Sequence, residues 1–162
     1  REGLDRLIGT CSREAQIVKK AAEWNVPVPT VIASSDIPNE LGRSFTITRR
    51  IEGETIARKI LRDTKWETAR LKLVTDCATA LAAIHSIPLE ELDGIELVKY
   101  TYSLTSLTEI YDALYDPHPT FDLAIRWLEA NRPEPLGPCL VHGDFRLGNL
   151  LIGKDGLRAV LD

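Results

Sequence analysis

Residues 142–162 contain the polar side chains that are best suited to chemistry. A short apolar segment, 138–141, predicts a strand that leads into His142 and Asp144, and Asn149 follows. The spacing therefore predicts a loop that brings the carboxylate of Asp144 into the neighbourhood of Asn149.

A hairpin follows this loop and ends at a second carboxylate. Two apolar arms, 150–152 and 157–161, flank an Asp-Gly pair, a strong short hairpin signal. A two-residue and a four-residue turn are both open, and each places Asn149 and Asp162 on one face. Amide and carboxylate oxygens suit a hard cation such as Mg²⁺. We therefore expect a magnesium site where the arms end, with Asp144 nearby.

An amphipathic helix is predicted over residues 12–25. Ile17, Val18 and two alanines follow the spacing of three and four that marks one helix face. Glu14 lies on that same face, which points toward the core. Its carboxylate is either paired there with a cation or placed in the first turn by the helix dipole, and the pattern leaves both open.

The segments after this helix change from strand to helix periodicity. Prolines hold the chain extended, and two strands over 30–33 and 44–50 are expected to pair antiparallel. From residue 54 to residue 132 the pattern is helical with short breaks. Gly53 is therefore the expected boundary between two lobes.

Three longer helices are expected in the helical part. The longest covers 65–86, and the others cover 104–115 and 120–131. One apolar stripe runs along the longest helix: Trp66, Ala69, Leu73, Cys77, Leu81 and Ile84.

The composition excludes several classes of protein. The chain has 162 residues, 44% hydrophobic and 27% charged, with a net charge of −4, as in a soluble globular domain. A basic excess and a long apolar run are both lacking, so nucleic acid and membrane are not expected partners. Three scattered cysteines predict reduced thiols and a cytoplasmic location rather than a zinc site. The chain has no Met and is expected to be a piece of a longer protein.

Charge is distributed unevenly along the chain. Residues 43–72 carry nine Lys and Arg against four Asp and Glu, whereas residues 90–122 carry eight acidic residues against one lysine. Solvated helix faces explain both runs. The alternative is a basic wall near a phosphate donor and an acidic wall near a cationic acceptor.

The catalytic motif resembles that of a known family. His142-Gly-Asp144-x-x-x-x-Asn149, followed by a hairpin and Asp162, is similar to the catalytic loop and metal-binding aspartate of aminoglycoside phosphotransferases and their choline-kinase-like relatives. The resemblance extends upstream, where a helix with an Arg-Glu pair, a Val-Pro-Val-Pro segment, a strand and a hinge come in the same order. Residues 41–45 and 50–53 most resemble the subgroup fused to acyl-CoA dehydrogenases.

The resemblance implies roles for the residues of the loop and hairpin. Asp144 is the catalytic carboxylate that orients the acceptor hydroxyl and takes its proton, and Arg146 holds a cation toward the transferring phosphate. Asn149 and Asp162 are the two ligands of Mg²⁺, which neutralises charge on the donor phosphates.

The resemblance also implies supporting and nucleotide-binding residues. His142 braces the loop, and Glu14 pairs with a phosphate-binding cation on a strand that lies upstream or, at the limit, is Arg1. The adenine of ATP is expected along the hinge, at Thr48, Arg49, Arg50 and Ile51.

The implied fold is α+β, a protein-kinase-like two-lobed fold that is incomplete at both ends. Residues 1–52 would be the remainder of the N-terminal nucleotide lobe, with its helix and hinge. Residues 53–162 would be a partial C-terminal helical lobe with the catalytic loop and the metal-binding hairpin.

The implied function is ATP-dependent transfer of a phosphoryl group to the hydroxyl of a small molecule. The isolated chain is expected to be inactive, because the phosphate-covering loop and the terminal helices of the family lie outside it. The alternative is a non-catalytic kinase-like nucleotide-binding or interaction module. The acceptor stays open between an aminoglycoside, an amino alcohol and a hydroxylated acyl compound. The dehydrogenase-linked resemblance favours the last, with a fused or neighbouring acyl-CoA dehydrogenase as partner.

Overall fold

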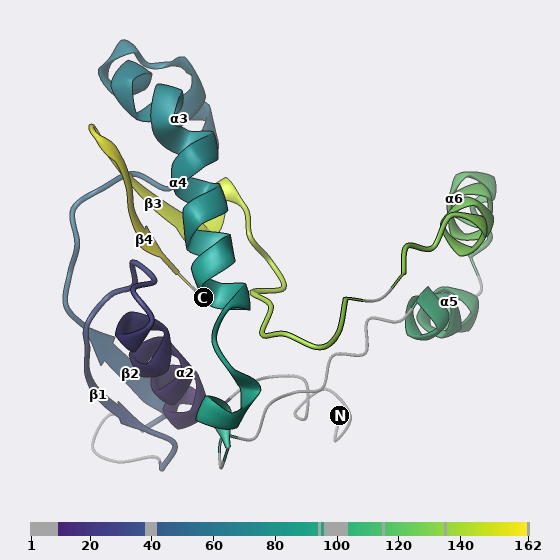
Figure 1. The fold of residues 1–162 in the computed structure, drawn as a ribbon, viewed down its shortest axis with the longest axis horizontal. Helices are drawn as coiled ribbons and strands as arrows, with labels where there is room; N and C mark the ends of the chain where they lie inside the picture. Colours follow the sequence, from purple (N-terminus) through teal and green to yellow (C-terminus); the bar gives the residue numbers. More distant parts are fainter. Residues whose placement is uncertain are drawn as a thin grey trace. The chain divides into compact units, whose positions relative to one another are not determined.

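The chain forms two compact units (Figure 1), one made of residues 1–97 and 139–162 and the other of residues 98–138. The structure, a computed structural model, describes the following residues: 10–37, 42–93, 95, 104–114, 116–134 and 136–161. The expected division of the lobes between residues 52 and 53 lies within the first unit and stays a prediction.

Helix α2 (Cys11–Glu23) confirms the helix predicted at the start of the chain. The side chain of Thr10 caps its N-terminus by accepting a backbone hydrogen bond at 3.2 Å. Asn25 adopts a left-handed φ of 59° just after the helix, and the Val-Pro segment that follows continues as extended chain. Ala21 is buried, which lets the helix approach its neighbours closely.

Strands β1 (Val31–Ser35) and β2 (Phe45–Thr48) pair antiparallel, as predicted. Figure 1 shows α2 beside this pair. An irregularity near the start of β1 shifts the register by one residue. The hydroxyl of Thr46 donates to the carbonyl of Cys11 at 3.1 Å and ties the strands to the helix.

Helices α3 (Ala57–Arg62) and α4 (Glu67–His85) are joined by the short 3-10 turn η1 (Thr64–Trp66), and η2 (Leu89–Leu92) follows. The guanidinium of Arg70 donates to two carbonyls at the end of α3, at 2.9 Å each, and fixes α3 against α4. The predicted apolar stripe is buried or half-buried along its whole length: Trp66, Ala69, Leu73, Cys77, Leu81 and Ile84.

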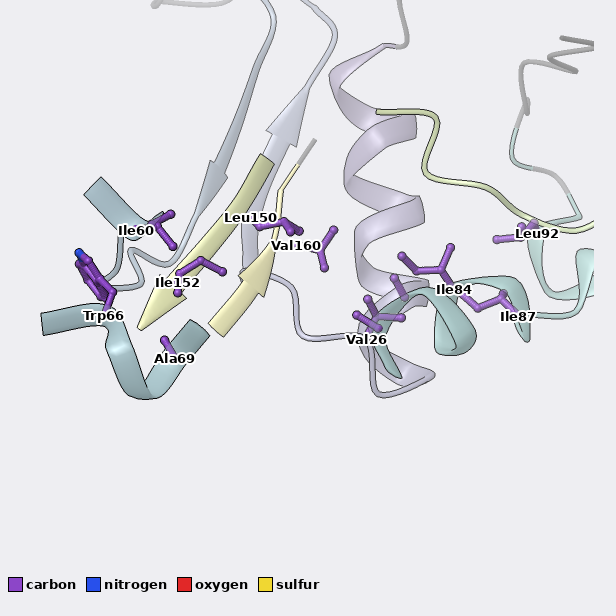
Figure 2. Packing of buried hydrophobic residues seen from close by; sticks show 12 residues of the cluster. Val26, Ile60, Trp66, Ala69, Ile84, Ile87, Leu92, Leu150, Ile152 and Val160 are labelled. Atoms are coloured by element: carbon purple, nitrogen blue, oxygen red, sulfur yellow. The ribbon is translucent and has the colours of Figure 1, made fainter. Parts of the chain in front are cut away.

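The core of the first unit lies between this stripe and a hairpin at the end of the chain. The hairpin consists of β3 (Leu150–Gly153) and β4 (Gly156–Val160), and the turn η3 (Leu147–Asn149) precedes it. Figure 2 shows Ile152 near Ile60 and Ala69 of the helices. Burial of these apolar side chains positions the hairpin, and with it the loop before it.

The hinge after β2 is held directly against the hairpin. Glu54 and Ile152 exchange two backbone hydrogen bonds, at 2.9 and 3.0 Å. A Cβ atom at Gly53 would lie 2.6 Å from Cγ of Leu151, closer than packed carbon atoms come. Only glycine therefore lets the hinge approach the hairpin this closely.

The second unit contains the two remaining predicted helices, α5 (Leu104–Ala113) and α6 (Pro119–Ala130). The rings of Tyr111 and Phe121 meet edge to face, with centroids 5.9 Å apart. The backbone N–H of His118 donates to the hydroxyl of Tyr111 at 2.6 Å and fixes the connection between the helices. Within the described ranges, no helix is both long and apolar enough to cross a membrane.

Candidate active site

The loop of residues 142–149 joins an extended segment to the hairpin. Residues 138–141 form no strand, contrary to the sequence prediction. A strand requires a neighbour that supplies backbone hydrogen bonds, and no strand partner for this segment lies among the described residues. The loop is therefore positioned by its side-chain hydrogen bonds and by the hairpin that follows it, and not by a strand before it.

His142 connects the loop to the end of the hairpin. Its Nε2 lies 3.0 Å from the carbonyl oxygen of Leu161, and its Nδ1 lies 3.3 Å from the backbone N–H of Asp144. A carbonyl only accepts and a backbone N–H only donates, so these partners assign the neutral imidazole with its proton on Nε2. Phe145 packs edge to face against the ring, with centroids 5.4 Å apart. This arrangement fits the bracing role expected for His142.

The carboxylate of Asp144 is held by two side chains from the same loop. Nε of Arg146 donates to Oδ1 at 3.0 Å and to Oδ2 at 2.9 Å. Nδ2 of Asn149 donates to Oδ2 at 2.9 Å and to the Asp144 backbone oxygen at 3.1 Å. Two of the predicted site residues, Arg146 and Asn149, therefore converge on the carboxylate of a third.

Burial differs sharply among these three residues. The side chains of Arg146 and Asp144 are 63% and 60% exposed, whereas Asn149 is only 6% exposed. The exposed ion pair can open at small cost, because such pairs contribute about 0–1 kcal/mol. Asn149 is fixed by the turn η3 and by the adjacent strand, so it holds Asp144 from the protein side.

The register of the hairpin differs from both predicted turns at its open end. Gly153 pairs with Gly156, which leaves Lys154 and Asp155 in the turn, but a bulge at Arg158 shifts the remaining pairs by one residue. Leu161 rather than Asp162 then comes opposite Asn149, and its N–H donates to the Asn149 carbonyl at 2.8 Å. Asp162 lies outside the described residues, so the expectation that it shares a face with Asn149 stays a prediction; the bulge itself was not predictable from turn length.

Asp162, the second predicted metal ligand, lies outside the described residues. Within the described part of the chain, no group of three or more His, Cys, Asp and Glu residues is arranged to hold a metal ion. Asn149 donates through its amide nitrogen, so its Oδ1 is the atom that suits a hard cation. A magnesium site in this loop stays a prediction.

Two carboxylates that the sequence did not single out support the site. Oδ2 of Asp76, on α4, accepts from the backbone N–H of Leu157 at 2.9 Å and anchors the hairpin turn. Glu54 forms an ion pair with Lys59 at 3.0 Å, and this hydrogen bond, with that of the Ile56 N–H, lowers the pKa of Glu54. The contact of Asp76 is not signalled locally, because the hairpin lies far from it in sequence, whereas the partners of Glu54 are its near neighbours in the chain.

Glu14 is in the first turn of α2 and is exposed, which fits the first-turn alternative rather than a carboxylate directed into the core. It lies at an apolar pocket together with Ile17 and Val18, which confirms the predicted shared face. Glu14 has an interaction partner in the structure. Pairing with a phosphate-binding cation stays a prediction, since Arg1 lies outside the described residues.

The hinge residues expected to line adenine are Thr48, Arg49, Arg50 and Ile51. They are extended and mostly exposed, and the Arg49 N–H donates to the Thr30 carbonyl at 2.8 Å. Among the described residues, no hydrogen bond or ion pair joins them to the loop of residues 142–149. In the described part of the chain, the hinge contacts the hairpin through the pairing of Glu54 with β3 and the close approach of Gly53 to Leu151.

Comparison with known proteins adds to this geometry. The sequence matches the "Phosphotransferase enzyme family" (APH) over residues 4–162. It is 31% identical over 157 residues to "Acyl-CoA dehydrogenase family member 10" of Mus musculus, covering 93% of this chain and 15% of that protein. It is 26% identical over 162 residues to "Acyl-CoA dehydrogenase family member 11" of Rattus norvegicus, covering 93% and 20%.

A solved structure, that of a "putative aminoglycoside phosphotransferase" from Ralstonia eutropha, superposes with a TM-score of 0.67. The two are 23% identical, and the match covers 94% of this chain and 49% of that one. This likeness confirms the predicted kinase-like fold of mixed helices and strands. The chain spans a fifth or less of the two curated relatives. By its match over nearly its whole length, the chain belongs to the phosphotransferase enzyme family.

Proposed function

We propose that this protein transfers the terminal phosphoryl group of ATP to a hydroxyl group of a small molecule. The observation that carries the proposal is the grouping of Arg146 and Asn149 around the carboxylate of Asp144. Phosphoryl transfer needs positioning and charge stabilisation more than covalent chemistry, and this loop supplies both. A non-catalytic module would not require a carboxylate held in this way.

Asp144 is the residue that acts on the acceptor. Its carboxylate accepts a hydrogen bond from the acceptor hydroxyl, aligns the oxygen with the transferring phosphorus and takes the proton as the new bond forms. The hydrogen bond of 2.9 Å from Asn149 keeps the carboxylate in one orientation. Because Asp144 is 60% exposed, an acceptor can reach it.

Arg146 is the cation that acts on the transferring phosphate. In the described geometry it pairs with Asp144 at 2.9 Å, and both side chains are exposed. Breaking so exposed a pair costs at most about 1 kcal/mol. Arg146 can therefore exchange the carboxylate for a phosphate oxygen, to which its charge is equally suited.

Mg²⁺ and ATP are the proposed cofactors. The amide oxygen of Asn149 and the carboxylate of Asp162 would hold Mg²⁺, which when bound neutralises charge on the donor phosphates. Residues 48–51 would line the adenine, and Glu14 would orient the phosphate-binding cation. Residues 1–52 and 53–162 would be the two lobes on either side of the nucleotide.

The acceptor that we propose is a hydroxylated acyl compound carried by coenzyme A. The curated relatives are named as acyl-CoA dehydrogenase family members, and this chain matches only 15% and 20% of their lengths. We propose a fused or neighbouring acyl-CoA dehydrogenase as the partner and the cytoplasm as the location. An aminoglycoside or an amino alcohol is the competing acceptor.

An acceptor screen with labelled ATP tests the proposal. The full-length protein is incubated with ATP, Mg²⁺ and a hydroxyacyl-CoA, an amino alcohol or an aminoglycoside, and label transfer is measured. The wild type is expected to label the hydroxyacyl compound, and Asp144→Ala is expected to label nothing. Asp93→Asn, the control, changes an exposed aspartate outside the site and is expected to transfer label normally. Label on another acceptor would refute the substrate class, and no label on any would refute phosphotransfer.

A further inference from the structure

The first turn of α2, which carries Glu14, is tied to the strand pair by two side chains from outside the helix. Oδ1 of Asp36, in the turn after β1, accepts from the backbone N–H of Ser12 at 2.9 Å. The hydroxyl of Thr46 on β2 donates to the carbonyl of Cys11 at 3.1 Å. Figure 1 shows α2 beside these two strands. The helix is therefore joined to the strands at two adjacent residues, once through a backbone donor and once through a backbone acceptor.

Asp36 completes the N-terminal cap of α2. The first N–H groups of a helix have no partner within it, and the side chain of Thr10 accepts from that of Arg13 at 3.2 Å. Asp36 accepts from a second one, that of Ser12, although it lies 24 residues away in sequence. Its negative charge also lies at the positive end of the helix dipole. The hydrogen bond from the Ser12 N–H lowers the pKa of Asp36, which favours the charged form of the carboxylate.

The turn that carries Asp36 is itself held in place. The hydroxyl of Ser35 donates to the carbonyl of Ile37 and accepts from its backbone N–H, at 3.2 Å in each case. These two residues flank Asp36, so its backbone is fixed while its side chain reaches the helix. The carboxylate is therefore a rigid support for α2 rather than a freely moving surface group.

Glu14 lies in the turn that is held in this way, two residues after Ser12. Its backbone N–H donates to the Thr10 carbonyl at 3.0 Å, and such hydrogen bonds make a helical turn move as one body. We infer that Asp36 is a positioning residue, which holds the first turn of α2 against the strands and thereby fixes the place from which Glu14 extends its carboxylate. The inference rests on the proposed function, in which Glu14 orients the cation that binds the phosphates of ATP.

Hydrogen exchange of the full-length protein tests whether Asp36 holds α2. Peptides that cover residues 10–16 are expected to exchange roughly three- to tenfold faster in Asp36→Ala, because loss of a helix cap shifts the opening equilibrium by such a factor. Asp36→Asn keeps an oxygen that can accept from Ser12, so its exchange is expected to stay within about twofold of the wild type. Asp36→Ser has a side chain too short for this bond and gives a second test should Asp36→Ala not fold. Asp93→Ala changes an exposed aspartate elsewhere and is the matched control.

Steady-state kinetics of phosphotransfer test whether this hold acts through Glu14. In Asp36→Ala, the KM for ATP is expected to rise roughly three- to tenfold while the KM for the acceptor stays within about twofold, because Glu14 acts on the nucleotide side of the site. A merely structural role would move both values or neither. Asp36→Asn is expected to restore the KM for ATP. In a Glu14→Gln background, Asp36→Ala is expected to add no further rise, because the residue through which Asp36 acts is already changed.

The possible results separate this inference from the proposed function. Unchanged exchange in Asp36→Ala and Asp36→Ser would overturn the inference. An equal rise of the two KM values, or a further rise in the Glu14→Gln background, would also overturn it. Absence of phosphotransfer in the wild type would refute the proposed function and with it the role through Glu14, whereas the exchange experiment would still decide whether Asp36 holds α2.

Discussion

Replacing Gly53 by alanine perturbs the contact between hinge and hairpin at its tightest point. The new methyl group would lie 2.6 Å from Cγ of Leu151 and 3.0 Å from the carbonyl oxygen of Ile152. That carbonyl accepts the hydrogen bond of 2.9 Å from Glu54, so the methyl group presses on the pairing as well as on a side chain. Overpacking of this kind costs about 1–3 kcal/mol, and we expect about 2 kcal/mol.

Urea unfolding measures this loss of stability. In a Trp127→Phe background, the remaining tryptophans, Trp24 and Trp66, both lie in the first unit, so their fluorescence reports on that unit alone. The midpoint is expected to fall without a change in slope. A drop in the thermal midpoint of roughly 4–8 °C corresponds to the same free energy in a chain of this size.

A double-mutant cycle identifies the cause of the loss. Leu151→Ala removes the atom that the Gly53→Ala methyl group meets first, so the double variant is expected to be about 1 kcal/mol more stable than the sum of the single changes. Gly42→Ala is the control. Nothing lies within 4 Å of the added Cβ at this position, so any loss of stability comes from the φ of 73°, which disfavours a side chain. Additive effects of Gly53→Ala and Leu151→Ala would refute the packing explanation.

Three further predictions concern the site and its supports. Arg146→Ala is expected to change the free energy of unfolding by less than about 0.5 kcal/mol, because its ion pair is exposed. The same change is expected to lower turnover roughly 10- to 100-fold, and unchanged turnover would contradict the catalytic role of Arg146. Asp76→Ala leaves the Leu157 N–H without its acceptor and is expected to cost about 1–2 kcal/mol in urea unfolding, against almost nothing for Asp93→Ala. The hydrogen bond from Lys59 lowers the pKa of Glu54 below 4.5, so its stabilising contribution is complete above pH 4.5 and is lost as the pH falls through the lowered pKa. Thermal unfolding of Glu54→Gln is therefore expected to depend less on pH below that value than unfolding of the wild type, and equal dependence would contradict the assignment.

Local patterns predicted most of the elements of this fold. The spacing of apolar residues predicted α4 and its buried stripe, and the Asp-Gly pair predicted the hairpin of β3 and β4. These features depend on neighbours within a few residues, so the sequence carries them directly. The loop from His142 to Asn149 was also predictable, since its chemistry is set by residue type and spacing.

Contacts between distant segments account for what the sequence did not predict. The bulge at Arg158 moves Leu161 opposite Asn149, and it belongs to the pairing of two whole strands rather than to the turn. Residues 138–141 read as a strand but have no described strand partner, and the sequence does not carry that information. Asp76 anchors the hairpin from a helix 81 residues away, a contact that only the folded chain creates.

The most direct test of the central claim compares the wild-type full-length protein with Asp144→Asn. Asparagine keeps the shape of the side chain and can still accept the hydrogen bond from Asn149, but it cannot take a proton from the acceptor. We predict that kcat for phosphotransfer falls by about 100-fold or more, the range typical of a general base, while the Kd for ATP changes less than about threefold. Equal kcat in the two proteins would contradict the assignment of Asp144 as the catalytic carboxylate.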